Sequence, residues 1–285
     1  MLVAGVLSWK WSQVERGCLH RFKETGSCAG CNLRGVNLSR LDLEGVDLRR
    51  ADLSNANLSS ARLARADLLQ VNLNGARLHS VNFTGANLHN ADLKAAVLSN
   101  ANLSGANLNK ASLEFAILVD TNINKANLWN TNLVEANLSA TKLVEANLVN
   151  ASLSGSNLSW ARFVDTDLTN VNLPAAILFG SGLSGSTVER KTLDQAFLCH
   201  TIMPDGVESK SDLSNSDLTG SFLYKVDLRG ADLEDADLTD VCLSGADLTD
   251  ANLRAAKLVG SVLKNVIFCN TTMPDGSTNN SGRIR

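Results

Sequence analysis

The residues best suited to chemistry in this chain are two cysteines, Cys28 and Cys31, which are separated by two residues. Such a pair can close a disulfide in an oxidising compartment, or it can supply half of a zinc site. Cys18 and His20 would complete a set of four zinc ligands, although their spacing is unusual for a zinc motif. A third interpretation is that two small apolar side chains simply pack in a core. The sequence leaves these interpretations open, and Cys28 with Cys31 is the candidate disulfide.

No other residues form a constellation with catalytic spacing. The sequence has no glycine-rich phosphate loop and no nucleophile elbow. Its 29 acidic residues mostly occupy one repeated position, not a paired-carboxylate site. A residue type that recurs dozens of times at the same repeat position is better explained by a structural role than by a role in one site. We therefore expect a protein that is not an enzyme, with no catalytic residues, no metal site, no cofactor and no small-molecule substrate.

A leucine recurs at nearly every fifth residue, and this pattern determines the secondary structure that would position any site. From Leu33 to Val188 there are 32 such positions, of which 28 are leucine, and the register resumes from Leu213 to Phe268. A small or β-branched residue stands two positions before most leucines, and Asn or Asp most often stands between the two. The two residues after the leucine are often Ser, Asn, Lys or Gly, which is typical of a turn.

A period of five fits neither an α-helix nor a long strand. Five residues advance about 500° on a helix, so the leucines would cover every side. On a strand five is an odd number, so successive leucines would alternate between faces. All the leucines converge on one axis only if the chain bends after every five residues and each turn stacks on the previous one. The pattern therefore predicts a solenoid.

The repeat resembles the motif A(D/N)LXX of the pentapeptide-repeat family, which residues 86–90 (ANLHN) and 231–235 (ADLED) match as they stand. The resemblance covers roughly residues 28–273. It implies an all-β fold, a right-handed quadrilateral β-helix with four pentapeptides per coil. The Thr-x-Met-Pro-Asp-Gly sequences at 201–206 and 271–276, together with the Cys-x-x-Cys opening, are similar to those of cyanobacterial members.

Departures from the repeat divide the chain into five parts. Residues 1–27 lack the pattern and carry Trp9, Trp11 and Phe22, so we expect a short N-terminal cap. Residues 28–203 are predicted to form a solenoid of about nine coils, and residues 213–273 a second run of about three coils. Residues 204–212 are an interruption or loop, and residues 274–285 are a C-terminal tail. Each run ends in Pro-Asp-Gly, which is a strong turn signal.

Composition limits the classes of partner and the cellular compartments that we expect for this chain. The net charge of −3 gives no general attraction to nucleic acid or to an anionic membrane. No apolar run approaches the roughly 18 residues of a membrane span. Residues 1–7 are apolar but short, and no Lys or Arg precedes them, so a secretory signal is weakly supported. We expect a cytoplasmic protein, or one of the periplasm or thylakoid lumen if the true start lies upstream.

Acidic residues gather in the second run. Residues 212–250 hold ten Asp and Glu against Lys225 and Arg229. Carboxylates twenty residues apart would stack on adjacent coils at about 5 Å, which is unfavourable; these pairs are Asp212 with Asp232, Asp217 with Asp237, and Asp227 with Asp247. The resemblance implies an alternative function here, because some family members are acidic rods that imitate duplex DNA and bind DNA gyrase. Arginines near the start of the first run interrupt any continuous acidic stripe.

Apolar side chains at outward positions are the last functional signal. With 20 residues per coil they project from one side of the first run, and a contiguous apolar patch on a soluble rod marks an interaction site. The candidate interaction patch comprises Val97, Phe115, Ile117, Val119, Trp160, Ile177, Phe179 and Phe197. Either residues 189–212 fold back over this patch, or it contacts a protein partner or a second copy. We expect a scaffold for protein–protein interaction, with gyrase binding as the alternative.

Overall fold

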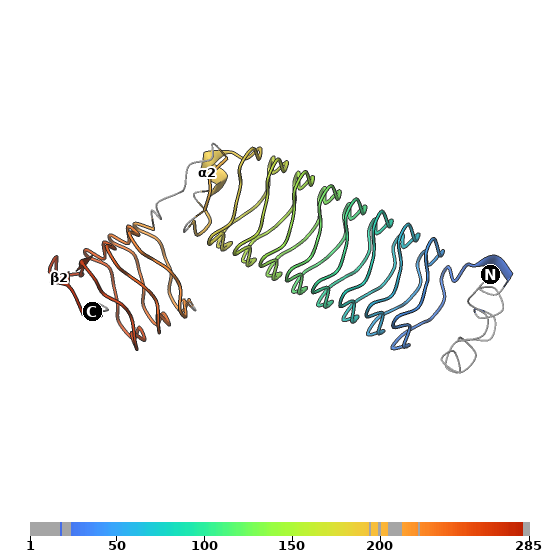
Figure 1. Ribbon diagram of the computed structural model, residues 1–285, viewed down its shortest axis with the longest axis horizontal. Coiled ribbons are helices and arrows are strands. Elements are labelled where there is room, and N and C mark those ends of the chain that lie inside the picture. Colours follow the sequence, from blue (N-terminus) through green and yellow to red (C-terminus); the bar gives the residue numbers. More distant parts are fainter. Residues whose placement is uncertain are drawn as a thin grey trace. The chain divides into compact units, whose positions relative to one another are not determined.

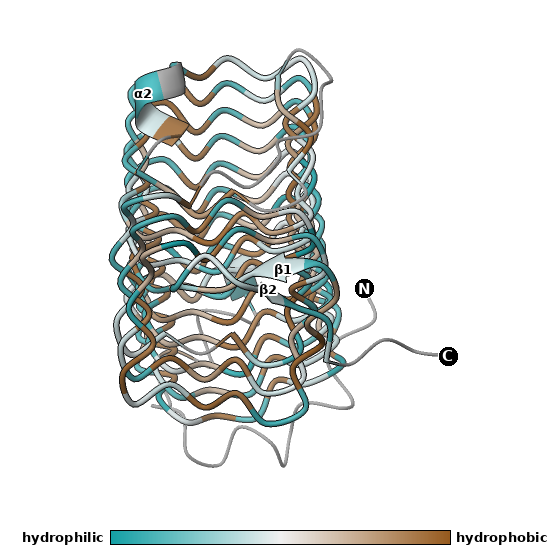
Figure 2. Cartoon of the chain, turned by 90° about the vertical axis from the view of Figure 1, so that its left-hand side faces the viewer, coloured by the Kyte–Doolittle hydropathy of each residue, from teal (hydrophilic) through white to brown (hydrophobic). Residues whose placement is uncertain are grey.

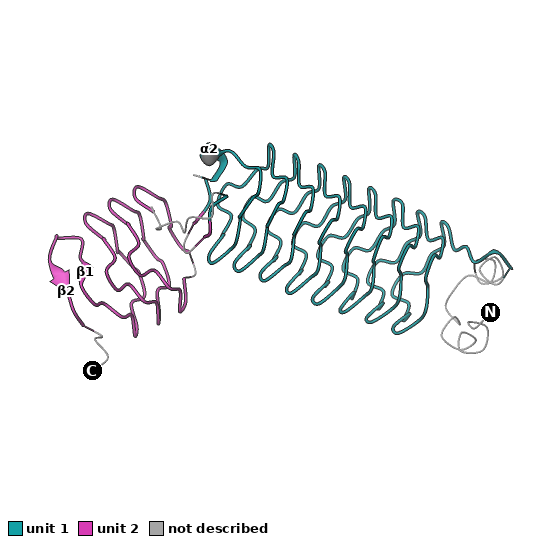
Figure 3. Ribbon diagram, turned by 45° about the horizontal axis from the view of Figure 1, so that its top comes forward, with its two compact units in different colours: residues 1–196, 203–206 teal, residues 197–202, 207–285 magenta. Residues whose placement is uncertain are grey.

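The computed structural model describes residues 18, 24–193, 195–198, 201–204, 213–221 and 223–281 of the chain. It divides into two compact units. Unit 1 contains residues 1–196 and 203–206, and unit 2 contains residues 197–202 and 207–285 (Figure 3). Within the described residues no helix has the length and hydrophobicity needed to cross a membrane.

Each unit is a stack of coils held together by a regular backbone ladder (Figure 1). The N–H group of Leu33 donates to the carbonyl oxygen of Asp52 at 2.6 Å, and Val36 N–H closes the following turn onto the carbonyl oxygen of Leu33. Parallel bridges join the residue before each leucine to its counterpart twenty positions later, for example Asn32 to Asp52. The predicted right-handed quadrilateral β-helix with four pentapeptides per coil is confirmed.

The interior of each coil is lined by the leucine and alanine positions of the repeat. Leu108 and Ala106 are both fully buried, as are their counterparts along unit 1. Some alanine positions hold threonine, and the buried hydroxyl then donates to a carbonyl group of the preceding coil. Thr131 Oγ1, for example, lies 2.9 Å from the carbonyl oxygen of Leu108. In Figure 2 apolar and polar residues accordingly alternate along every coil.

The Asn or Asp before each leucine has a local role that explains its recurrence. The Oδ1 atom of Asp52 accepts a hydrogen bond from the N–H group of Ser54 at 3.0 Å, which stabilises the turn that follows. It also accepts from Asn72 Nδ2 of the next coil at 3.0 Å. The fifth residue of the repeat then adopts a left-handed conformation, as at Asn100 (φ 60°) and Gly105 (φ 65°). This conformation favours Gly, Asn and Asp.

The last coil of unit 1 departs from the repeat. At the helix α2 (Arg190–Leu193) the hydrogen-bond register shifts by one residue. Ala175 N–H reaches the carbonyl oxygen of Gln195, twenty positions later, where other coils use nineteen. Leu193 is still buried. The nineteen-residue spacing returns where Gly185 N–H donates to the carbonyl oxygen of Pro204 at 3.0 Å. Except for Pro204, the predicted interruption at 204–212 lies outside the described residues.

The described part of the predicted C-terminal tail, residues 274–281, takes part in a hairpin. The strand β1 (Thr271–Thr272) pairs in antiparallel fashion with β2 (Thr278–Asn279). Met273 N–H donates to the carbonyl oxygen of Ser277, and Phe268 N–H donates to that of Ser281. Residues 277–281 therefore cover part of the last coil's edge.

The disulfide of the first coil is not the one expected. Cys31 pairs with Cys18, at a Cα–Cα distance of 5.8 Å, and not with Cys28. Both Cys28 and Cys31 are buried, but only Cys31 is bonded to Cys18. The bond therefore fastens the predicted N-terminal cap to the first coil. Most of residues 1–27 lie outside the described residues.

The buried leucine column predicts the effect of a charge in the core. Leu108→Asp should lower the free energy of unfolding by several kcal/mol, because it places an unpaired carboxylate at a fully buried position. Asn100→Asp, at an exposed corner whose left-handed conformation Asp tolerates, should be nearly neutral. Chemical denaturation followed by far-UV circular dichroism measures both. A stable Leu108→Asp protein would contradict the buried column.

The disulfide makes a separate prediction about oxidised protein. Cys18→Ser should lower its stability by about 3 kcal/mol, the loop-closure value for a separation of 13 residues. The loss should vanish when both proteins are reduced. Cys28→Val should show no such dependence on oxidation. Thermal unfolding with and without reductant checks this, and an oxidation-dependent loss in Cys28→Val would restore the pairing expected from the sequence.

Candidate interaction face

One side of unit 1 carries most of the predicted patch, and we call it the interaction face. It comprises residues 36–40, 56–60, 76–80, 96–100, 116–120, 136–140, 156–160 and 176–180. Parallel bridges hold its outward residues in one column along the stack, in the order Arg77, Val97, Ile117, Asn137, Asn157 and Ile177. The twenty-residue register therefore places the predicted side chains on a common side.

The first apolar cluster of this face lies on two neighbouring coils. Val97 and Ile117 are bridge partners, and Ile117 is 40% exposed. Val119 is half-buried on the same coil as Ile117. Phe115 stands at the corner that leads into the face, and 56% of it is exposed.

The second cluster is built around Trp160. Its indole ring meets the ring of Phe179 edge-on, with the ring centroids 5.0 Å apart. The backbone N–H group of Trp160 donates to the backbone carbonyl oxygen of Phe179. The Trp160 ring lies over Gly180, where a Cβ atom would come within 2.6 Å of it. Ile177 is half-buried beside this pair. Trp160 is nevertheless 59% exposed, so more than half of its surface is left uncovered.

Polar residues divide the predicted patch into two groups. Asn137, Ser139 and Asn157 stand between the two clusters. Phe197 belongs to unit 2, where it is half-buried, and so lies outside the face as defined for unit 1. The structure thus brings seven of the eight predicted residues to one side and its adjoining corner, in two groups.

The two exposed aromatic residues occupy corners that favour smaller side chains. Trp160 has φ 62° and Phe115 has φ 59°. A left-handed conformation is uncommon for bulky residues, and such positions cluster at functional sites. Gly or Asn occupies many equivalent corners at no steric cost, as at Asn100 and Gly105. The aromatic side chains are therefore not required by the fold.

The interaction face is almost uncharged. Its only charged residues are Arg40, Arg77 and Asp120. The ion pairs of the described coils of unit 1 lie on the other three sides, as between Lys94 and Glu114 or Lys125 and Glu145. Low charge lowers the desolvation cost of contact with another protein.

A polar hollow lies at the end of the face that is nearer the N-terminus. It has a volume of about 570 Å³, and its lining residues are Ser39, Arg40, Leu41, Asn57, Ser59, Ser60 and His79. The guanidinium group, the hydroxyl groups and the amide can all donate hydrogen bonds. The face is therefore hydrogen-bonding and basic at one end and apolar towards the other.

Sequence reasoning missed apolar residues on the other sides of unit 1. They share the position directly after the leucine and are half-buried; they are Leu69, Trp129, Val134, Val144, Val149 and Val164. The Nζ atom of Lys110 lies 5.5 Å from the centroid of the Trp129 ring, so a neighbouring coil partly covers this tryptophan. The signal was present in the repeat position itself, but the covering depends on the stack.

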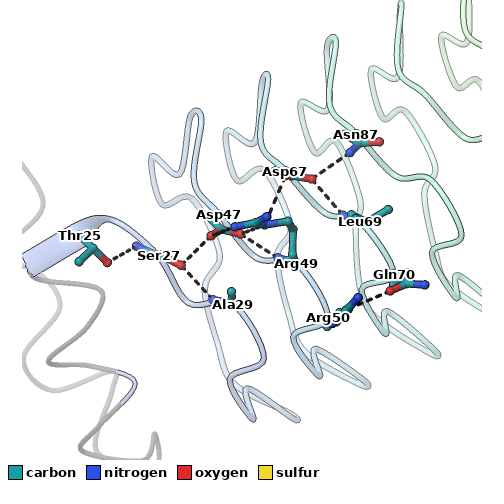
Figure 4. Close-up of polar contacts among 10 residues, drawn as sticks. All are labelled: Thr25, Ser27, Ala29, Asp47, Arg49, Arg50, Asp67, Leu69, Gln70 and Asn87. Carbon is teal, nitrogen blue, oxygen red and sulfur yellow. Dashed lines mark hydrogen bonds and ion pairs between the residues drawn. The ribbon is translucent and has the colours of Figure 1, made fainter.

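A polar network joins the first three coils on another side (Figure 4). Arg49 donates to both carboxylate oxygens of Asp47 at 2.9 Å, and Ser27 Oγ donates to Asp47 at 2.7 Å. The hydrogen bond from Arg49 holds the pKa of Asp47 well below its usual range. Arg49 Nε also lies 3.5 Å from Asp67. These contacts link Ser27 to the repeat, and Arg49 also lines a shallow hollow of about 400 Å³ with Ala29, Gly30, Arg50 and Leu69.

The acidic columns of unit 2 are stacked as predicted but have local partners. Asp217 and Asp237 are bridge partners, as are Asp227 and Asp247. Lys257 Nζ lies 2.9 Å from Asp237, and Arg229 Nη2 lies 2.6 Å from Asp227. A hydrogen bond from Thr239, followed by that from Lys257, lowers the pKa of Asp237 to about 2. Asp212 lies outside the described residues.

The cysteines do not form the zinc site considered above. Cys18 and Cys31 are bound to each other, so their sulfur atoms are not thiolate ligands, and His20 lies outside the described residues. Across the described part of the chain no three His, Cys, Asp or Glu residues are grouped to hold a metal ion. Cys242 is half-buried, with Sγ 3.7 Å from Ser244 Oγ.

Comparison with protein families gives an extended match. The model of pentapeptide repeats matches eight copies, across residues 27–190 and 209–275. A comparison with curated proteins finds no match.

Solved structures of similar proteins come from several sources. HetL of Nostoc sp. strain PCC 7120, a pentapeptide repeat protein involved in heterocyst differentiation regulation, is 28% identical, with 92% of this chain and 98% of that chain covered and a TM-score of 0.42. A pentapeptide repeat protein from Cyanothece 51142 is 25% identical, with 57% and 97% covered and a TM-score of 0.27. QnrB1, a plasmid-mediated fluoroquinolone resistance protein, is 15% identical, with 75% and 87% covered and a TM-score of 0.37.

The Asp237 carboxylate predicts a pH dependence of the stability of unit 2. Because its pKa is about 2 in the folded chain and its ordinary value is 3.8, ionised Asp237 stabilises the fold above about pH 4. The contribution is lost as the pH falls towards 2. Asp237→Asn should therefore be less stable than the parent at pH 6 and equally stable near pH 2. Asp235→Asn, at an exposed corner of the same coil, is the control. A pH-independent difference for Asp237→Asn would contradict this.

Proposed function

We propose that this chain, which belongs to the pentapeptide-repeat family, is a non-enzymatic scaffold whose interaction face binds a protein partner. The observation that carries the proposal is the placement of two apolar clusters along the least charged side of unit 1, one with Phe115 at its adjoining corner and one built on Trp160 and Phe179. Large aromatic side chains are the usual anchors of protein interfaces. A surrounding surface of serine and asparagine lets such anchors dock without breaking ion pairs.

The dimensions of the face favour a slender partner. Eight coils at about 4.8 Å spacing give a strip about 34 Å long, and its extended segment of three residues is about 10 Å wide. This area falls well below the roughly 800 Å² that each partner of a standard interface buries. The width of the strip, about 10 Å, matches the diameter of one α-helix, which is about 10–12 Å with side chains. A single partner segment laid along the stack therefore fits better than a broad domain surface or a second copy.

The alternative of a DNA-mimicking rod that binds DNA gyrase receives less support. Such a surface needs a continuous acidic stripe, whereas the carboxylates of Asp227 and Asp237 are paired with Arg229 and Lys257. In unit 1 the basic hollow and Arg77 add positive charge to the face. A gyrase supercoiling assay with added protein addresses this alternative directly, because a DNA mimic would inhibit supercoiling or protect against quinolones.

The compartment is also a matter of proposal. The Cys18–Cys31 disulfide supports the periplasmic or lumenal alternative over the cytoplasm, since disulfides persist in oxidising compartments. A cyanobacterial source is suggested by the Thr-x-Met-Pro-Asp-Gly terminators and by the origin of two similar structures. Alkylation of free thiols in the source cells, followed by mass measurement, tests the disulfide in place.

The interaction face yields a prediction about partner capture. Trp160→Ala combined with Phe179→Ser should abolish retention of a partner that the unaltered chain captures from an extract of the source organism. Its unfolding temperature should change little, because Trp160 is mostly exposed. Trp129→Ala, which removes an aromatic ring from a different side, is the matched control and should still capture the same protein.

Three results would contradict the interaction face. The double variant could retain the same protein as the parent. It could unfold at a clearly lower temperature, which would indicate a role in folding. Trp129→Ala could also lose the partner to the same extent, which would place the contact elsewhere on unit 1.

A further inference from the structure

The described residues of the chain protect only half of the edge of the last coil of unit 2. Residues 266–275 are covered by residues 277–281, through the pairing of β1 with β2 and the hydrogen bonds of Phe268 and Met273 described above (Figure 1). Residues 256–265 precede that covered half and form the other two sides of the same coil. We call residues 256–265 the open edge.

The backbone groups of the open edge are arranged for a strand that the described chain does not supply. Four backbone N–H groups of the open edge have no hydrogen-bond acceptor among the described residues, namely those of Leu258, Gly260, Leu263 and Asn265. The backbone carbonyl groups of Ala256 and Ser261 likewise have no donor among the described residues. An unpaired edge of this kind is a template for another strand.

The preceding coil shows what these groups bind when the ladder continues. Leu238 N–H donates to the carbonyl oxygen of Lys257 at 2.8 Å, and Leu243 N–H donates to that of Val262 at 3.0 Å. In return, Lys257 N–H donates to the carbonyl oxygen of Ala236 at 2.9 Å. One more parallel segment of ten residues would satisfy all six groups of the open edge with the same geometry.

Side chains at the open edge are correspondingly uncovered. Leu258 and Leu263 are half-buried, whereas their counterparts Leu238 and Leu243 are fully buried. Val259 is 73% exposed, the highest value among the large apolar residues described, and Val262 is 49% exposed. Covering these side chains would remove apolar surface from water.

We propose that the open edge binds an extended segment of a different polypeptide, which adds to it as a parallel strand. The edge defines the chemistry of that segment. Its two inward residues, five positions apart, should be leucine-like so that they cover Leu258 and Leu263. Its outward residues over Val259 and Val262 should be apolar or small.

Charge complements this pattern at two positions. The residue stacked on Lys257 should be acidic, because Asp237 pairs with Lys257 in this way on the opposite side. A second acidic residue is favoured over Lys264, which is exposed and has no ion pair among the described side chains. The site is therefore selective for a segment with two leucines and two carboxylates, not for any extended chain.

A peptide copied from the preceding coil is the direct probe. The peptide of residues 236–245 with Cys242→Val and Ser244→Glu carries both leucines and both acidic residues in the required register. It should bind the full chain with one-to-one stoichiometry, measured by fluorescence anisotropy. N-methylation at peptide positions 237 and 242 removes the two N–H groups that would donate to Ala256 and Ser261, and should weaken binding at least about tenfold.

Protein variants locate the binding. Lys264→Glu should weaken binding several-fold, and a peptide with lysine in place of the glutamate should restore it. Lys142→Glu, at an exposed lysine of unit 1, is the control and should leave the affinity unchanged. Equal affinity for the N-methylated peptide, equal affinity of Lys264→Glu, or no binding of the parent peptide would each overturn the proposal. Sedimentation that shows oligomers dispersed by the peptide would assign the edge to a second copy and would also overturn it.

Discussion

The structure depends on one constraint, namely that the chain must return to the same place after every twenty residues. Each coil can bond to the next only if four bends close it into a square, because the N–H groups of one coil donate to carbonyl groups nineteen positions later. The left-handed corner after each leucine provides the bend. The carboxylate or amide two residues before the turn stabilises it from within the same repeat, as Asp52 does for Ser54. The leucine side chain is then directed into the interior of the coil.

This constraint leaves the outward positions free and explains how a surface can be built on them. A residue contributes to the fold through its backbone and its inward neighbours, so the outward side chain can change without loss of the ladder. A binding surface on this fold would therefore be formed by columns of outward side chains, in which each residue lies beside the residue twenty positions later. The interaction face is such a side, in which charge is nearly absent, and the bulky residues Trp160 at its own corner and Phe115 at the adjoining one occupy positions suited to smaller side chains. The ion pairs on the other sides use the same geometry to stabilise neighbouring coils.

The same ladder creates a problem at every end, because its last coil presents unpaired backbone groups. The chain answers this in different ways. A disulfide from Cys18 fastens the start of the chain to the first coil, α2 closes one side of the last coil of unit 1, and a hairpin covers half of the last coil of unit 2. The remaining half is the open edge. An uncovered end thus differs from a covered one by identifiable hydrogen bonds, and this difference is what makes the open edge a candidate for binding.

The sequence by itself determined the coil, its period, its inward leucines and the alignment of the predicted patch, since each follows from a pattern written into every five residues. The solenoid, the twenty-residue register and the stacking of Asp217 on Asp237 follow from that local rule alone. Only the tertiary structure decided that Cys18 and not Cys28 pairs with Cys31, that Asn137 and Asn157 divide the patch, and that Trp160 lies over Gly180. It also decided that residues 277–281 turn back over half an edge. These features depend on contacts between coils and on where the stack stops, and a repeating pattern carries no information about either.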